Sequence, residues 1–156
     1  MTTYYTQSST GTFRESASVT GQILNTLCHF AGAETDNSFY RDETIDIDIQ
    51  LALALTPVAG APVNTYILYA MNGTNYEDGI PGTNTGAAAA SPAPNANALV
   101  DSHGVLASTG VQKWTIKDVP VLPYKYRVEH YNGTTKSASG VLLTTLVYGR
   151  HGEIIG

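Results

Sequence analysis

The sequence predicts an all-β protein, an antiparallel β-sandwich or jelly roll with an extended N-terminal arm. The strongest observation is the stretch 45–55, in which every odd position is a large aliphatic residue and every even position is Asp, Gln or Ala. A period of two over this length predicts a long strand with one buried face. Several shorter strand-like runs are separated by Pro, Gly and Asn. No helical period is long enough to cover a parallel sheet, which excludes an α/β fold.

The remaining strands follow from β-branched and aromatic runs between turn residues. Residues 56–62 are rich in Pro and Gly and predict a turn that joins the long strand to a second strand at 63–70 as a hairpin. Asn132-Gly133 is typical of a tight hairpin turn. In the run 124–130, tyrosines, Val128 and His130 alternate with charged residues, which predicts a half-buried strand. Further strands are expected at 99–100, 112–119 and 141–148.

The length of 156 residues suits a single domain spanning 1–156. Within it we expect an extended arm at 1–20, the β-sandwich at 36–150 and a long flexible loop at 80–98. That loop is dominated by Pro, Gly, Asn, Thr and a run of alanines, which cannot pack a core. The segment 16–30 fits either one helix or two short strands.

Composition excludes several classes of function. Charged residues are only 13% of the chain, the net charge is −5, and Lys and Arg form no cluster, so nucleic acid is not an expected partner. The one cysteine, Cys28, lies in an apolar stretch and is expected to be a buried small residue. We find no signal peptide and no run long enough to span a bilayer, so we expect synthesis in the cytoplasm and no membrane partner.

Two groups of residues could carry acid–base or metal chemistry. Asp46 and Asp48 share a strand face and could bind Ca²⁺, although a solvated face explains them more simply. Asp101-Ser102-His103 resembles a hydrolase triad in composition, but triad members come from separate segments of a chain. No histidine or cysteine pair has metal-ligand spacing. We therefore expect no catalytic residue, no cofactor and no metal.

Trp114 offers a different possibility, because an exposed indole ring is a stacking platform for sugars. A core position for Trp114 is the commoner explanation. The alternatives to a structural protein are therefore a carbohydrate- or receptor-binding sandwich, which needs Trp114 exposed with several tyrosines, and a hydrolase, which needs a polar cleft.

A series of motifs carries a resemblance to a known family. In chain order they are Asp36-Asn37-Ser38, the alternating stretch 45–55, the Thr-Tyr-Ile-x-Tyr run at 65–69, the loop Asn-Gly-Thr-Asn-Tyr-Glu-Asp-Gly at 72–79, Val-Pro-Val-Leu-Pro at 119–123, Asn-Gly-Thr at 132–134 and Ser139-Gly140. This order resembles the capsid cement or decoration proteins of tailed bacteriophages, which are small virion structural proteins with a jelly-roll fold. The resemblance spans roughly residues 36–150 and covers neither the N-terminal arm nor the loop rich in Ala and Pro.

The resemblance implies a binding role on the exterior of the virion. Such proteins attach to the outer capsid surface as oligomers and bridge neighbouring major capsid subunits. The expected partners are therefore the major capsid protein and further copies of this chain, as a dimer or trimer. The arm and the long loop are the expected contact regions, with Tyr4, Tyr5, Phe13, Ile80, Pro92 and Pro94 as the contact residues.

Overall fold

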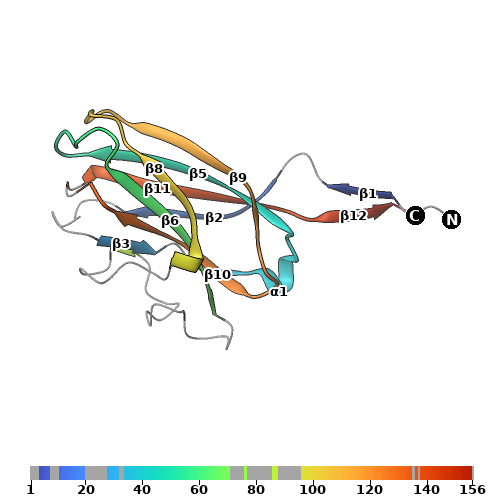
Figure 1. Ribbon diagram of the computed structural model, residues 1–156. Coiled ribbons are helices and arrows are strands. Elements are labelled where there is room, and N and C mark those ends of the chain that lie inside the picture. Colours follow the sequence, from blue (N-terminus) through green and yellow to red (C-terminus); the bar gives the residue numbers. More distant parts are fainter. Residues whose placement is uncertain are drawn as a thin grey trace.

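Two antiparallel sheets packed face to face form the body of the protein (Figure 1). The computed structural model describes residues 4–7, 11–19, 28–31, 34–70, 76, 86–87, 96–134, 136 and 138–155. One sheet has four strands in the order β2 (Thr12–Val19), β11 (Ala138–Arg150), β5 (Thr44–Leu53) and β9 (Gln112–Pro120). The other has six: β7 (Gly86–Ala87), β3 (Cys28–Ala31), β10 (Lys125–Asn132), β6 (Pro62–Ala70) and β8 (Leu99–Gly104), with β4 (Thr35–Asp36) beside β10. The predicted all-β sandwich is confirmed.

Within the residues that the structure describes, helical structure is confined to two short turns. Helix α1 (Asn37–Tyr40) begins after Asp36, whose carboxylate accepts a hydrogen bond from the Ser38 backbone N–H at 3.1 Å. The 3₁₀ turn η1 (Ala96–Ala98) precedes β8. Across the described segments, no helix has the length and apolar composition needed to cross a membrane.

The long strand β5 confirms the alternation seen in the sequence. Its odd-numbered residues face the other sheet and form the centre of the core, with Ile45, Ile47, Ile49, Leu51 and Leu53 all buried. Burying a side chain of this size contributes about 1.5–3 kcal/mol each, so this strand is a large part of the driving force for folding. Leu55 departs from the prediction: β5 ends at Leu53, and Leu55 lies exposed in the following loop.

Both predicted hairpins are wrong. Strand β5 pairs with β9 and β11, whereas β6 belongs to the opposite sheet, so residues 54–61 cross between sheets. The Asn132-Gly133 turn likewise joins β10 of one sheet to β11 of the other. Turn residues specify where the chain reverses, but which strand becomes the hydrogen-bonded neighbour depends on the packing of both sheets.

Strand β10 is buried on both faces rather than on one. The side chains of Arg127 and Glu129 are completely buried and lie 3.3 Å apart as an ion pair. Tyr76 covers them, with the Arg127 guanidinium 4.3 Å from the centre of its ring. The Tyr76 hydroxyl donates a hydrogen bond to Glu34, 2.8 Å away, and this contact holds the Tyr76 ring beside Arg127.

The predicted loop 80–98 and arm 1–20 contain regular structure. Within the loop, Gly86–Ala87 forms β7, and Ala98 of η1 packs against a small cluster of Leu68, Ala70 and Tyr76. Within the arm, Thr12–Val19 forms β2 at the edge of the four-stranded sheet. Of the two alternatives for 16–30, the described part follows the strand alternative, since it lies in β2 and β3.

Candidate docking surface

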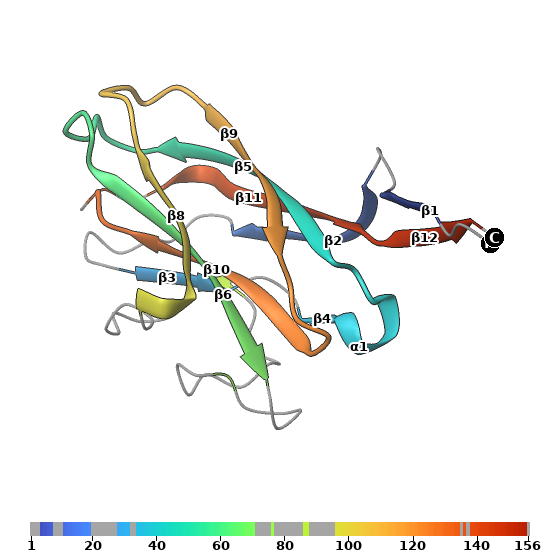
Figure 2. The ribbon, with the colours of Figure 1, turned by 45° about the vertical axis from the view of Figure 1, so that its right-hand side comes forward.

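A two-stranded ribbon extends from one end of the sandwich. Strand β1 (Tyr4–Gln7) pairs antiparallel with β12 (Gly152–Ile155), and Tyr4 lies opposite Ile155. The ribbon forms a sheet of its own, and Figures 1 and 2 show it lying clear of the two larger sheets. The outer edge of each strand has no strand partner among the described residues. An unpaired strand edge is a surface on which another protein can add a strand.

The base of the ribbon is built around the buried carboxylate of Asp42. Arg14 of β2 donates two hydrogen bonds to it, from Nε and Nη2, each at 2.6 Å. The side chains of Asp42 and Arg14 are 0% and 7% exposed, so the pair is shielded from solvent and from salt. The hydrogen bond to Asp42 raises the pKa of Arg14, against the opposing effect of burial.

The backbone of Asp42 is fixed by the side chain of Asn37. The Asn37 amide donates to the Asp42 carbonyl at 2.9 Å, and its oxygen accepts from the Asp42 N–H at 2.8 Å. The same amide nitrogen also donates to the Leu122 carbonyl at 2.9 Å. Asn37 therefore joins helix α1, the start of β5 and the turn before β10 at this end of the molecule.

Gly149 of β11 leaves the space that the Asp42 carboxylate occupies. A Cβ atom at this position would overlap the Asp42 carboxyl group and crowd Arg14 Nε. Two residues later, His151 lies between β11 and β12, with Nδ1 at 3.7 Å from Asp42 Oδ1. Asp42 thus connects the strands that lead into both halves of the ribbon.

Exposed aromatic side chains accompany this ion pair. Phe13 and Phe39 are 53% and 78% exposed, and Tyr40 is also exposed. Phe13 packs edge-on against Tyr148, with the centres of the two rings 5.9 Å apart. The Arg14 guanidinium lies 4.2 Å from the centre of the Tyr40 ring. Aromatic residues held in place by such contacts are common in protein–protein interfaces, because they bury large areas with little loss of side-chain entropy.

The predicted contact residues meet different outcomes. Tyr4 and Tyr5 lie in β1 of the ribbon, and Phe13 is exposed near its base. The remaining three lie outside the described residues: Ile80, Pro92 and Pro94. Asp42, Arg14 and Gly149 were not predicted from the sequence as functional residues. A glycine within a strand is a signal that another group approaches closely, and Gly149 could have been found by it.

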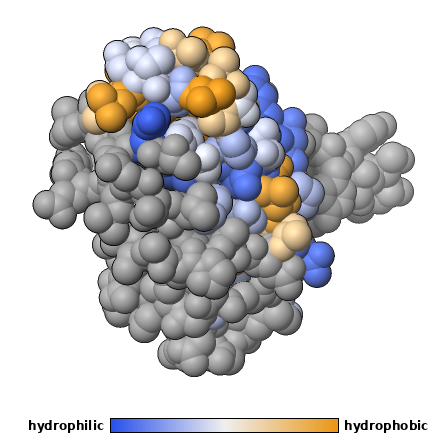
Figure 3. Space-filling view, turned by 60° about the vertical axis from the view of Figure 1, so that its left-hand side comes forward, coloured by the Kyte–Doolittle hydropathy of each residue, from blue (hydrophilic) through white to orange (hydrophobic). Residues whose placement is uncertain are grey.

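The opposite end of the sandwich carries exposed aliphatic residues instead. They belong to the β5–β6 and β8–β9 loops: Leu55, Val58, Leu106 and Val111. Figure 3 shows hydrophobic residues gathered at the top of the described surface. The two loops are joined by hydrogen bonds from the Gly60 N–H to the Val105 carbonyl and from the Val105 N–H to the Ala61 carbonyl, at 2.8 and 3.0 Å. We call this region the loop end and the opposite one the ribbon end.

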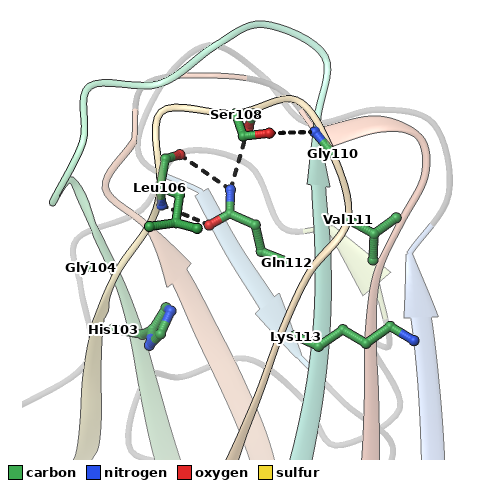
Figure 4. Close-up of a pocket in the computed structure, with 8 residues that line it drawn as sticks. All are labelled: His103, Gly104, Leu106, Ser108, Gly110, Val111, Gln112 and Lys113. Atoms are coloured by element: carbon green, nitrogen blue, oxygen red, sulfur yellow. Dashed lines mark hydrogen bonds between the residues drawn. The ribbon is translucent and has the colours of Figure 1, made fainter.

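A hollow of about 420 Å³ lies beside the β8–β9 loop (Figure 4). Gln112 fixes this loop: its amide nitrogen donates to the carbonyls of Leu106 and Ser108, and its oxygen accepts from the Leu106 N–H at 2.7 Å. In Figure 4 the side chain of Lys113 points away from the loop. The polar groups of Gln112 therefore hold the loop itself. The hollow is lined by the exposed apolar residues Leu106 and Val111 and also by the exposed Lys113 and the partly exposed His103.

Trp114 does not present a free ring for a sugar. The His103 ring stacks on it in parallel, with the centres 4.2 Å apart, and the indole packs against the hydrophobic core. His103 comes from β8 and Trp114 from β9, so the stack closes the gap between the two sheets along this edge. A sugar would have to displace His103 before it could stack there.

The other candidate groups have structural partners. Arg150 binds Asp46, which also accepts a hydrogen bond from the Asp118 N–H at 3.0 Å, while Asp48 accepts from Thr115 at 2.6 Å. Ser102 donates to Asn64 at 2.7 Å, whereas the neighbouring His103 stacks on Trp114. In the described part of the chain, no group of three or more His, Cys, Asp or Glu side chains could hold a metal ion.

Comparison with known proteins identifies no relative of this chain. No protein-family model, no curated protein and no solved structure matches it.

Proposed function

We propose that this protein is a non-enzymatic virion structural protein that binds the outer surface of a tailed-phage capsid and stabilises contacts between major capsid subunits. In this proposal the ribbon end is the docking surface. The observation that carries it is the β1–β12 ribbon, which pairs only with itself among the described strands and leaves both outer edges without a strand partner. A two-stranded ribbon is marginally stable alone in water, so a partner that extends its hydrogen bonding would stabilise it.

The arrangement of strands supports the jelly-roll part of the proposal. Apart from the two-residue strands β4 and β7 of the six-stranded sheet, eight strands divide between the two sheets in the orders β2-β11-β5-β9 and β3-β10-β6-β8. Double-sheet jelly rolls have eight strands arranged as two Greek keys, and viral capsid proteins and lectins both use them. Between these two classes we favour the virion protein, because the Trp114 ring that a lectin-like site would use is stacked on His103.

The low charge of the chain fits attachment to a protein surface. Only 13% of residues are charged, and the ribbon strands contain a single charged residue, Glu153. Removing such a surface from water carries a small desolvation cost. The exposed aromatic residues at the base of the ribbon, Phe13, Phe39 and Tyr40, would supply the apolar contact area.

Co-sedimentation with purified heads of the phage that encodes the chain tests this proposal. We expect the wild-type chain to sediment with the heads, and the double substitution Tyr4→Ser and Tyr5→Ser to weaken binding by at least about tenfold, which corresponds to about 1.4 kcal/mol. The matched control is the double substitution Val58→Ser and Leu106→Ser at the loop end, which should bind like wild type.

Two results would contradict the proposal in different ways. Undiminished binding of the ribbon variant would exclude the ribbon end as the docking surface while leaving the virion function standing. Failure of the wild-type chain to bind heads would exclude the capsid function itself.

A further inference from the structure

A single histidine connects the two sheets inside the core. His130 of β10 is 2% exposed. Its Nδ1 lies 3.0 Å from the hydroxyl of Thr65 on the neighbouring strand β6, and its Nε2 lies 2.7 Å from the hydroxyl of Thr145 on β11. Because β11 belongs to the other sheet, the imidazole ring forms a polar bridge through an otherwise apolar core.

The neutral form of His130 suits this position. A neutral imidazole has one N–H donor and one acceptor nitrogen, and a threonine hydroxyl can serve as either partner. Both ring nitrogens are therefore satisfied without any net charge in the core. The side chains of Thr65 and Thr145 are themselves buried, so water does not solvate the bridge from outside.

Among the described contacts, no charged side chain forms a hydrogen bond with the His130 ring. On β2, the strand beside β11, the register partners of Thr145 and Val147 are Ala17 and Glu15. On β10 the ionic residues Arg127 and Glu129 alternate with His130 and lie on the opposite face of the strand. On β6 and β11 the groups that contact the ring are the two threonine hydroxyls, and on β3 the register partner of His130 is Phe30, while His29 pairs with Tyr131. Burial is accordingly what lowers the pKa of His130, to about 3.

We propose that His130 is an acid-sensitive contact between the two sheets, which we call the latch. In this proposal, protonation of the His130 ring separates the sheets and opens the sandwich. An imidazolium ion at this position would be removed from water with two threonine hydroxyls, rather than a carboxylate, as its hydrogen-bond partners, which is costly. The unfolded or opened chain exposes the same ring to water and accepts the proton readily. Acid therefore favours the open state over the closed one.

The direction of the effect follows from the two protonation states. The ordinary pKa of histidine is near 6.5, and the folded value is lower, so between these values the unfolded chain binds one more proton than the folded chain. The contribution of His130 to stability is complete above about pH 6.5 and is lost as the pH falls below it. One extra proton changes the unfolding equilibrium constant by up to about tenfold for each pH unit.

Two measurements test the latch. In the wild-type chain, the ring resonances of His130 are followed by NMR as the pH is lowered, and we expect them to remain those of a neutral imidazole for as long as the protein is folded. In parallel, the unfolding equilibrium constant is measured with urea from neutral to acidic pH for wild type and for His130→Gln. Glutamine keeps a donor and an acceptor but takes up no proton. Below pH 6.5, the unfolding equilibrium constant of the variant should therefore increase less steeply with acid than that of wild type, by up to about tenfold for each pH unit.

His103→Gln is the matched control, because His103 is partly exposed and stacks on Trp114 rather than bridging the sheets. This variant should keep the wild-type pH dependence. A His130 ring that titrates near the ordinary histidine value within the folded protein would overturn the proposal. So would a His130→Gln variant with the wild-type slope; if that variant does not fold, the wild-type NMR titration decides.

Discussion

The two ends of the sandwich are held together by different kinds of contact. At the ribbon end, the ion pair between Arg14 and Asp42 joins residues that are 28 positions apart in the chain. At the loop end, backbone hydrogen bonds join the β5–β6 and β8–β9 loops, and the β8–β9 loop itself is fixed by the neutral amide of Gln112, which binds groups four and six positions away. Contacts between distant segments are lost only when the fold opens as a whole, whereas a local clamp can open without disturbing the sheets. We therefore expect the Arg14–Asp42 pair to report on global stability and the Gln112 contacts to report on local opening of the β8–β9 loop.

The largest expected effect comes from the substitution Asp42→Asn. The amide retains the shape of the carboxyl group but leaves the Arg14 guanidinium buried without a counter-charge, so we expect a loss of about 3 kcal/mol in the free energy of unfolding. Urea denaturation followed by circular dichroism measures it. The matched control is Asp48→Asn, which removes a charge that accepts a hydrogen bond near the surface from Thr115 and should cost about 1 kcal/mol or less. Equal losses would contradict the role given to the buried pair.

A methyl group at position 149 should have the next largest effect. In Gly149→Ala the new Cβ would overlap the Asp42 carboxyl group, so the ion pair must shift, and we expect a cost of about 2 kcal/mol. The matched control lies at the loop end: Gly110→Ala meets only the Ser108 hydroxyl at 3.3 Å and should change stability by no more than about 0.5 kcal/mol. If Gly149→Ala leaves the free energy of unfolding unchanged, the base of the ribbon is loosely packed and the prediction is wrong.

Removing the Gln112 side chain tests whether its hydrogen bonds control local opening of the β8–β9 loop. Gln112→Ala leaves the Leu106 N–H without its side-chain acceptor, and we expect a cost of about 1 kcal/mol in global stability. The stronger sign should be faster hydrogen exchange of amides in the β8–β9 loop, with exchange in β5 unchanged. Faster exchange throughout both sheets would show that the loop end is coupled to the whole fold.

The smallest effect is expected for the exposed aliphatic residues. Leu106→Ser removes an apolar side chain that is 67% exposed, so the free energy of unfolding should stay within about 0.5 kcal/mol of wild type. Retention on a hydrophobic-interaction column should decrease, since the apolar area of the loop end is reduced. A large loss of stability would contradict this prediction, because it would mean that the Leu106 side chain is buried against other residues in solution.

The sequence was sufficient for features that depend on a strand's own pattern. The alternation in 45–55 predicted both β5 and its buried face, because a period of two is a property of one strand. Partnership between strands was not predictable in the same way, and both hairpins were assigned wrongly. The burial of Arg127 and Glu129 was also missed, since it depends on Tyr76, which lies some fifty residues earlier in the chain.

The candidate site shows the same division. Tyr4, Tyr5 and Phe13 were expected to mediate contacts because they lie in a polar N-terminal stretch, and that expectation requires only local sequence. The Asp42 ion pair depends on Arg14, Asn37 and Gly149 meeting in space. No spacing in the sequence predicts that these residues are in contact, although Gly149 within β11 indicates that another group approaches the strand closely.

The register of the ribbon has a practical consequence for engineering. Tyr4 and Ile155 are partners across it, so the two ends of the described chain lie beside each other. A short flexible linker could join them, and new ends could be opened within the β8–β9 loop, giving a circularly permuted chain with the same sheets. A fluorescent domain attached at those new ends would sit at the opposite pole from the ribbon and would leave it free to engage a surface.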